Sequence, residues 1–396
     1  MKNKKEIQVL YVITKLELGG AQKVCLSLFN GLKSNGHESF LLSGNHDTNN
    51  KNPLLKQVTK QAEELSQAEK NTNIILLKNF TREISIKKIF LEIKNFFDLL
   101  KTIRKIKRDN PNLIVHTHST KAGLVGRWAA FFAGVKKRVH TVHGYGFHDH
   151  QNKIAWFITY FLELITSFVT THYVCVSTED VKTGVKLFPK FSKKHSIIRA
   201  AVDWEQFYIP AKETNNFPEH KESFIFGTVS CFKKQKNLLD LFKAFEYAYT
   251  QNHNIKLEVV GDGHLRPEFE KWITEHDLEN KIILHGWQEK VAPIMINWNA
   301  YVMSSLWEGL PCAIVEARLL KLPVLSYKTG GIHDVIIHGK NGFLYKQGNW
   351  RELASGMLAV CGNRYLYKKL QEFPDNLTDF NDQQMVKQHL ELYKEL

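Results

Sequence analysis

Short apolar runs alternate with amphipathic helical segments along most of the chain, and this alternation constrains the fold more than any other feature. The apolar run at 9–13 precedes an amphipathic stretch at 21–34, and the run at 113–116 precedes a helical pattern at 123–133. Such alternation is typical of parallel β-sheets covered by their crossover helices. The sequence therefore predicts an α/β fold.

The alternation is interrupted by a polar, proline-bearing segment at 207–223 and resumes at 224–229. With 396 residues the chain is long enough for two domains of ordinary size. Four later apolar runs predict the strands of a second sheet, at 256–260, 281–284, 300–303 and 323–326. We therefore predict two Rossmann-like, doubly wound domains that face a central cleft.

The expected boundaries follow from this pattern. The first domain spans 1–205, a linker spans 206–222, the second domain spans 223–375, and a last helix at 376–396 crosses back to the first domain. A polar insertion at 45–73 is expected to form a loop and one helix.

Cysteine usage and hydropathy favour a cytoplasmic protein. The five cysteines are widely spread and form no Cys-x-x-Cys pair, which argues against a disulfide framework or a zinc site. The first apolar run is too short for the core of a signal peptide. The stretch 154–176 approaches the length of a membrane span, but Glu163 at its centre disfavours insertion. We predict a buried helix there, followed by a strand at 173–176.

Lysine and arginine exceed aspartate and glutamate by 54 − 40 = 14, which favours anionic partners. A basic run at 101–108 ends an amphipathic stretch, and basic amphipathic helices suit anionic membrane surfaces. A merely solvated basic surface is the alternative. No recognisable nucleic-acid module accompanies the charge, so nucleic acid is not an expected partner.

The segment 305–317 combines two glutamates with a predicted turn and helix start. Gly309 permits a tight turn and Pro311 suits the first helical position, which leaves Glu308 in the loop and Glu316 in the early turns of the helix. Backbone N–H groups at a helix start can receive a diphosphate, and a carboxylate can accept both hydroxyls of a ribose. Taken alone, the pair could equally be two surface glutamates on a helix.

Residues 304–344 resemble glycosyltransferase family 4. The match includes two glutamates separated by seven residues, together with the stretches 321–326, 329–334 and 339–344 and, upstream, 259–263 and 285–287. The resemblance implies that Glu316 binds the ribose of a nucleotide sugar and that Glu308 contacts the transferred sugar. It also assigns Gly309, Leu310 and Gly261 to the donor site.

The N-terminal half is similar to the same family, especially to members that build capsule, O-antigen and exopolysaccharide repeat units. The matching stretches are 18–22, 82–84, 116–123 and 140–144. By resemblance, His143 is the active-site histidine, and His118, Lys121 and Tyr145 are acceptor-side residues. Gly19 and Gly20 stand between a strand and a helix, where absent side chains let backbone N–H groups approach a phosphate or an acceptor.

Two lysines complete the expected donor site. The family has an arginine five residues before a lysine, both directed at the diphosphate; Lys236 matches the lysine, whereas Cys231 occupies the arginine position. We hypothesise that Lys233 supplies the missing cation. A unit charge at 4 Å is worth up to about 4 kcal/mol at an effective dielectric of 20, against about 0.3–2 kcal/mol for a helix terminus.

The resemblance implies a GT-B fold and a retaining glycosyltransferase that moves a sugar, hexosyl or N-acetylhexosaminyl, from a UDP-sugar in bacterial surface polysaccharide synthesis. A polyprenyl-diphosphate-linked acceptor and peripheral attachment to the inner face of the membrane are expected. The sequence contains no Asp-x-Asp, so we expect no cofactor and no obligatory metal. Six histidines between 116 and 150 leave a metal site as an alternative.

Two other functions stay open from sequence. One is a nucleotide-sugar epimerase of the same fold, and the other is a catalytically silent binding subunit of a polysaccharide assembly complex. Intact Glu308, Glu316, Lys236 and His143 argue against the second.

Overall fold

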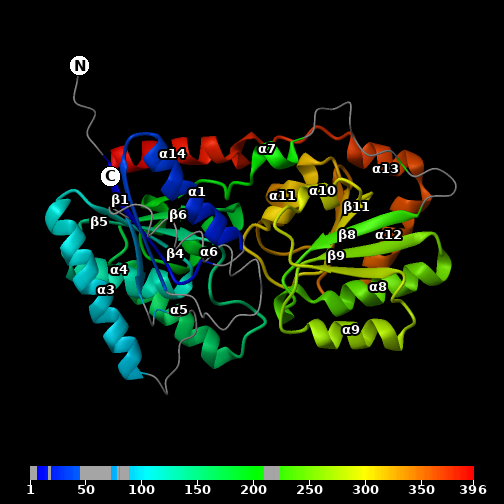
Figure 1. Cartoon of the computed structure of the whole chain (residues 1–396), viewed down its shortest axis with the longest axis horizontal. Helices are drawn as coiled ribbons and strands as arrows, with labels where there is room; N and C mark the ends of the chain where they lie inside the picture. Colours follow the sequence, from blue (N-terminus) through cyan, green and yellow to red (C-terminus); the bar gives the residue numbers. More distant parts are fainter. Residues whose placement is uncertain are drawn as a thin grey trace. The chain divides into compact units, whose positions relative to one another are not determined.

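The structure, a computed structural model, describes residues 7–16, 19–44, 73–77, 80, 89–208, 217 and 223–396 (Figure 1). It divides into two compact units, one formed by Met1–Ala201 with Asp379–Leu396 and the other by Val202–Thr378. The sequence predicts that the first domain ends at 205 and that the second spans 223–375; the observed division falls after Ala201 and after Thr378. Positions 45–72 of the expected insertion, the motif at 82–84, Leu18 and most of the expected linker lie outside the described residues.

The first unit contains a seven-stranded parallel sheet in the order β3-β2-β1-β4-β5-β6-β7. Its strands are β1 Gln8–Ile13, β2 Glu38–Gly44, β3 Ile74–Leu77, β4 Ile114–His118, β5 Lys137–Val142, β6 His172–Cys175 and β7 His195–Ile197. The chain leaves β1 toward β2 and later returns to β4 on the other side of β1. The point between β1 and β4 is therefore the topological switch point of this sheet.

Right-handed crossovers place the helices of this unit on opposite sides of the sheet, because the connections run in opposite directions from the switch point. Helix α1 (Gly20–Ser34, blue in Figure 1) covers one side together with α14 (Asp382–Glu395, red), and Gly31 of α1 closely approaches Val386 of α14. The other side is covered by α3 Ile89–Asp109, α4 Thr120–Phe132, α5 Lys153–Ser167 and α6 Thr178–Leu187, followed by a short 3-10 turn, η2 Phe191–Lys193. Their inner faces meet the sheet in an aliphatic core that includes Leu99, Ile103 and Val115.

The second unit contains a six-stranded parallel sheet in the order β10-β9-β8-β11-β12-β13. Its strands are β8 Phe224–Val229, β9 Ile255–Val260, β10 Ile282–Gly286, β11 Ala300–Met303, β12 Val324–Tyr327 and β13 Gly342–Tyr345. Its helices are α7 Trp204–Phe207, α8 Leu238–Gln251, α9 Arg266–Glu275, α10 Ala292–Met295, α11 Cys312–Leu319, α12 Trp350–Gly362 and α13 Arg364–Gln371, with 3-10 turns η3 Lys234–Lys236 and η4 Gly330–Asp334. A further 3-10 turn, η5 Thr378–Phe380, spans the boundary between the two units. The switch point lies between β8 and β11.

The prediction of a buried helix from residue 154 is wrong in one respect: the helix forms as α5 and packs Trp156, Tyr160 and Leu164 against a core cluster, but its opposite apolar side is exposed. The buried residues of α5 are Glu163, Thr166 and Ser167, whereas Ile154 is 75% and Phe157 60% exposed. Within the part of the chain that the structure describes, no helix is both long and apolar enough to cross a membrane.

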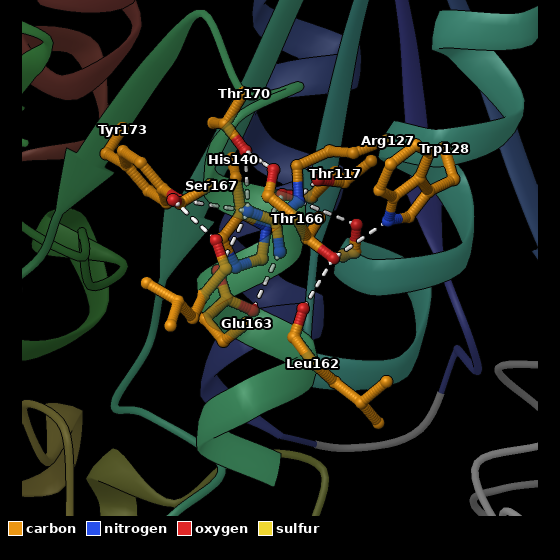
Figure 2. Close-up of polar contacts among 12 residues, drawn as sticks. Thr117, Arg127, Trp128, His140, Leu162, Glu163, Thr166, Ser167, Thr170 and Tyr173 are labelled. Carbon is orange, nitrogen blue, oxygen red and sulfur yellow. Dashed lines mark hydrogen bonds and ion pairs between the residues drawn. The ribbon is translucent and has the colours of Figure 1, made fainter. Parts of the chain in front are cut away.

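A buried ion pair explains why α5 turns its polar side inward (Figure 2). Arg127 of α4 is fully buried and donates from Nη1 and Nη2 to the two carboxylate oxygens of Glu163, both at 2.8 Å. Arg127 also donates to Thr170 Oγ1 at 2.9 Å and to Gly123 O at 2.7 Å. Burial acts to lower the pKa of Arg127, but the Glu163 carboxylate outweighs it, and the pKa is raised. A buried guanidinium needs a carboxylate partner, so the partner fixes the rotation of the helix.

Candidate active site

In the second unit, the loops that follow β8 and β11 lie at the switch point and are joined to each other. Leu306 N donates to Gln235 O at 2.8 Å. The Ser304 hydroxyl contacts the carbonyl oxygens of Lys236 and Asn237 at 3.0 and 2.9 Å. Ligands of open α/β sheets bind outside the carboxyl ends of the strands at such a point. The two loops therefore form one preorganised candidate site in this unit.

Glu308 and Lys236, which are 72 residues apart in sequence, form an ion pair at this site. Lys236 Nζ donates to Glu308 Oε1 at 2.5 Å, and both side chains are largely buried. Burial acts to lower the pKa of Lys236, but the Glu308 carboxylate beside it outweighs that effect and the pKa is raised. The lysine therefore stays charged at neutral pH and holds the carboxylate in one place.

Gln235 is a neighbour of Glu308 that the sequence analysis did not single out. Its side-chain amide donates to Trp307 O at 2.7 Å and lies 3.5 Å from Glu308 Oε2. Both carboxylate oxygens of Glu308 are thus oriented by residues of η3. Gln235 stands between the two lysines of the recognised motif, but no spacing rule marked it.

The turn at Thr329–Gly331 supports the backbone beneath Glu308. Gly330 has φ +49°, and a Cβ atom there would lie 2.1 Å from Glu308 O. Gly331 N donates to Gly309 O at 2.6 Å. Only glycine fits a position that combines a left-handed backbone with so close an approach. This contact explains why the stretch from 329 matters to the site.

Helix α11 carries Glu316 in its second turn, where the residue is 5% exposed. The helix begins at Cys312, and Pro311 is its N-cap, so the prediction of Pro311 as the first helical residue is wrong by one position. The extended backbone of Pro311 (ψ 107°) places it just before the first turn. Leu310 is buried at the start of this helix.

The far end of α11 is fixed by a buried ion pair. Arg318 Nη2 lies 2.8 Å from Asp375 Oδ2, and Asn341 Nδ2 donates to Asp375 Oδ1 at 2.7 Å. Arg318 also donates to Leu322 O at 2.7 Å. These contacts tie α11 to three later segments and so hold Glu316 in position.

Two further donor-site candidates lie in the loops after β8 and β9. Gly261 has φ +129°, and a Cβ there would lie 2.0 Å from Ser230 O, so the loops touch backbone to backbone. Lys233 is half-buried at the N-cap of η3, and no described residue pairs with its ammonium group. Cys231 is also partly exposed. Lys233 and Lys236 thus stand at the two ends of one 3-10 turn.

In the first unit, the loops after β1 and β4 meet at the switch point. Thr14 Oγ1 lies 3.2 Å from Ser119 Oγ, and Ser119 has φ +68° at the N-cap of α4. Gly19 is the N-cap of α1, with an extended backbone, and Gly20 is its first residue. The expected glycine turn is therefore placed at the helix start that faces the carboxyl end of β1.

His118 and His143 contact each other directly at the ends of β4 and β5. His118 Nδ1 lies 3.0 Å from His143 Nε2. Burial, followed by the neighbouring histidines, lowers the pKa of both, to about 4 for His143. Both rings are thus neutral at pH 7, and one donates the shared hydrogen bond to the other.

Three residues on this side were missed by the sequence analysis. They are Tyr11 of β1 and, on the C-terminal helix α14, His389 and Tyr393. Tyr393 Oη of α14 lies 2.5 Å from His116 Nδ1 and 3.2 Å from Tyr11 Oη. His389, also on α14, is buried 5.6 Å from the His116 ring, and burial lowers its pKa to about 4. No local motif marks a tyrosine or histidine that returns to the first unit near the end of the chain.

The remaining acceptor-side candidates have structural contacts. Lys121 is buried, and its Nζ donates to Glu92 Oε1 of α3 at 2.7 Å. The Tyr145 ring stacks on Phe147 at 5.0 Å, and burial raises the pKa of its hydroxyl. Among the described residues, no three His, Cys, Asp or Glu side chains are grouped so as to hold a metal ion.

Two doubly wound parallel sheets with polar loops at both switch points define the fold class of the protein, GT-B. Solved structures of this class cover the chain almost completely. HepE of Anabaena in complex with UDP and glucose covers 99% of this chain and all of its own, with a TM-score of 0.76 and 17% identity. Sucrose-phosphate synthase of Thermosynechococcus elongatus has a TM-score of 0.77, 16% identity and 98% and 99% coverage. These likenesses support the fold.

Sequence comparisons identify the family. The model of Glycosyltransferase Family 4 matches residues 18–206, and that of Glycosyl transferases group 1 matches 211–376. A UDP-Gal:alpha-D-GlcNAc-diphosphoundecaprenol alpha-1,3-galactosyltransferase of Escherichia coli is 31% identical over 293 residues, which are 72% of this chain and 74% of the relative. The capsular polysaccharide glycosyltransferase CapM of Staphylococcus aureus is 26% identical over 67% of this chain and 70% of its own. The chain belongs to glycosyltransferase family 4.

Proposed function

We propose that this glycosyltransferase transfers a sugar, with retention of configuration, from a UDP-sugar to a diphosphate-lipid-linked saccharide in the synthesis of a bacterial surface polysaccharide. The observation that carries the proposal is the Lys236–Glu308 ion pair at the switch point of the second sheet. The identity of the donor and acceptor follows the Escherichia coli relative, whose name gives a UDP-sugar and a diphosphoundecaprenol acceptor. The structure of HepE with UDP and glucose supports the same donor class.

The second unit supplies the groups that such a donor needs. Lys236 and, beside it, Lys233 present cations where the leaving diphosphate gains charge, and preorganised charges of this kind contribute much of enzymatic rate acceleration. Glu316 is proposed to bind the ribose hydroxyls, and Glu308 to contact the transferred sugar. When the diphosphate engages Lys236, the carboxylate of Glu308 is left to interact with the sugar near the reacting carbon.

The acceptor side is assigned to the first unit. His143 is held by His118 and is neutral, so it can hydrogen-bond a sugar hydroxyl without adding charge. We propose that the acceptor hydroxyl attacks on the face from which the diphosphate departs and that a donor phosphate oxygen takes its proton. The two lysines supply the charge that a metal would otherwise provide, so transfer is proposed to continue in the presence of a chelator.

A transfer assay tests the proposal. A panel of radiolabelled UDP-sugars is incubated with diphosphate-prenyl-linked N-acetylglucosamine, with and without EDTA, and the product anomer is assigned by NMR. Glu308→Ala is expected to abolish transfer while the protein still folds, and Glu316→Ala is expected mainly to raise the donor KM. Wild-type turnover in Glu308→Ala would refute the role of Glu308. Donor epimerisation without acceptor would replace transfer by the epimerase alternative.

A further inference from the structure

Helix α5 carries an exposed apolar stripe along its whole length. Ile154, Phe157, Ile158, Phe161 and Leu162 are exposed, and positions separated by three and four residues line one side of a helix. Phe168, at the C-cap, is 71% exposed. The stripe lies opposite the buried Glu163, so the Arg127 pair that draws the polar side inward also directs the apolar side to solvent.

Next to α5 lies α4, which carries exposed aromatic residues of its own. Trp128 of α4 donates from Nε1 to Thr166 Oγ1 of α5 at 3.0 Å (Figure 2). The Trp128 ring stacks on Phe132 at 5.9 Å and meets Phe131 edge-on at the same distance. Phe131 and Phe132 are themselves exposed at the end of the helix.

From α4 the exposed aromatic surface reaches α3. The Phe96 ring lies edge-on to Phe132 at 6.2 Å and to Phe97 at 5.7 Å. Phe97 is 59% exposed, and Phe90, seven residues earlier on the same side of α3, is 86% exposed. We call the whole set the apolar face; it consists of Phe90, Ile93, Phe97, Phe131, Phe132, Ile154, Phe157, Ile158, Phe161, Leu162 and Phe168. Soluble monomers rarely expose so many large apolar side chains together, and such patches mark interaction sites.

Cations border the apolar face. The same outer stripe of α3 changes from apolar to basic along its length, with exposed cations at Lys94, Lys101, Arg104, Lys105 and Arg108 and exposed acids at Asp98 and Asp109. Arg104 Nη2 donates to Phe132 O at 3.2 Å, so the basic half lies directly against the exposed phenylalanines. Lys107 Nζ donates to Gly134 O at 2.7 Å and keeps α3 against the end of α4.

We propose that the apolar face docks in the interface of an anionic membrane, with its phenylalanines among the upper acyl chains and the cations of α3 among the lipid phosphates. Large apolar side chains flanked by lysine and arginine are the combination that interfacial helices use. A second copy fits less well, because a two-fold interface would bring the basic stripes together. The proposal deepens the proposed function and rests on it for a lipid-linked acceptor.

Vesicle flotation of the full-length protein, without donor or acceptor, tests this surface. Vesicles of phosphatidylcholine alone are compared with vesicles that contain equal parts of phosphatidylcholine and phosphatidylglycerol. The wild type is expected to float with the anionic vesicles and not with the neutral ones. Binding of both vesicles to the same extent, or of neither, would overturn the proposal.

Two sets of variants separate the apolar and the electrostatic parts. Phe157→Ser with Phe161→Ser is expected to lower the partition coefficient at least 10-fold; the matched control changes two exposed tyrosines of the second unit, Tyr247→Ser with Tyr365→Ser. Lys101→Glu with Lys105→Glu and Arg108→Glu is expected to lower it on the order of 100-fold. Its control is the same change of charge at Lys243, Lys340 and Lys346, which are exposed in the second unit.

The outcomes distinguish the surface from the function and from self-association. All variants are checked for an unchanged melting temperature and for transfer to a short-chain, water-soluble acceptor. Transfer without flotation would refute the membrane surface and leave the proposed function standing. Flotation without transfer would refute the proposed function and leave the membrane surface standing. A wild type that is dimeric by light scattering, with a monomeric Phe157→Ser/Phe161→Ser variant and no flotation, would assign the apolar face to a second copy instead.

Discussion

Replacing Glu163 by alanine should destabilise the first unit far more than an ordinary loss of one carboxylate. The substitution leaves Arg127 fully buried, with its two charge-assisted bonds to Glu163, both at 2.8 Å, removed (Figure 2). Thr170 Oγ1 and Gly123 O remain as neutral acceptors, at 2.9 and 2.7 Å. Neither carries the negative charge that the guanidinium requires, and bulk water does not reach it.

The size of the effect follows from this geometry. Removing one partner of a buried pair destabilises a protein by about 3–5 kcal/mol, because the remaining charge is uncompensated. A domain of this size loses about 2–4 °C of melting temperature per kcal/mol. Glu163→Ala should therefore lower the melting temperature of the first unit by roughly 6–20 °C.

Calorimetry and urea unfolding at pH 7.5 measure the change, and two controls bound it. Glu179 of α6 is a partly exposed carboxylate that lies 3.6 Å from Lys182, and Glu179→Ala should lower the free energy of unfolding by only about 0.5 kcal/mol. The double variant Arg127→Met/Glu163→Leu should be more stable than Glu163→Ala alone, since both charges are gone. A Glu163→Ala protein as stable as Glu179→Ala would show that the ion pair does not fix α5, and the reasoning would fail.

Three further predictions concern the candidate site. Lys236→Ala should lower kcat/KM for the donor on the order of 100- to 1,000-fold, because up to about 4 kcal/mol of charge interaction is lost. Lys234→Ala in the same turn should have little effect, and equal kcat/KM values for the two variants would remove Lys236 from the donor site. The unfolding free energy should fall as the pH decreases from 6.5 toward 4, by about 1.4 kcal/mol per pH unit for each buried neutral histidine, because the unfolded chain binds the proton first. In urea unfolding, His389→Gln should reduce this pH dependence by the contribution of one histidine. An unchanged pH dependence would contradict the lowered pKa of His389. His118→Ala should lower kcat about 10-fold with little change in donor KM. His118→Asn should restore part of the lost kcat, because the asparagine amide can replace Nδ1 as the partner of His143. An effect of His118→Ala on KM alone would exclude this positioning role.

The strands could be predicted closely because parallel strands are buried on both faces and read as continuous apolar runs. The predicted runs at 224–229 and 300–303 coincide with β8 and β11. Helix α5 shows the limit of the same reasoning. Its hydropathy indicates burial, but its rotation is decided by Arg127, which is 36 positions before Glu163. The sequence of the helix itself does not indicate which of its sides contacts that arginine.

The candidate site was predictable where a short motif carries it and unpredictable where the fold assembles it. Glu308 and Lys236 could each be chosen from local sequence, but their contact depends on β8 and β11 being neighbours in the sheet. Pro311 shows how boundaries shift by one residue even in a recognised motif. His389 and Tyr393 could not be chosen at all, since only the return of α14 to the first unit brings them beside His116.

The two switch points share one topology but differ in the chemistry that their loops present. In both sheets, successive crossovers leave in opposite directions and uncover the strand ends, so polar side chains can gather there without interrupting the core. The second unit places a charged lysine and carboxylate at this position, whereas the first unit places histidines whose pKa values are lowered by burial. Charge suits a leaving diphosphate, and neutral imidazoles suit sugar hydroxyls that must be hydrogen-bonded without being ionised. This division of chemistry is what the proposed transfer requires of two units with the same fold.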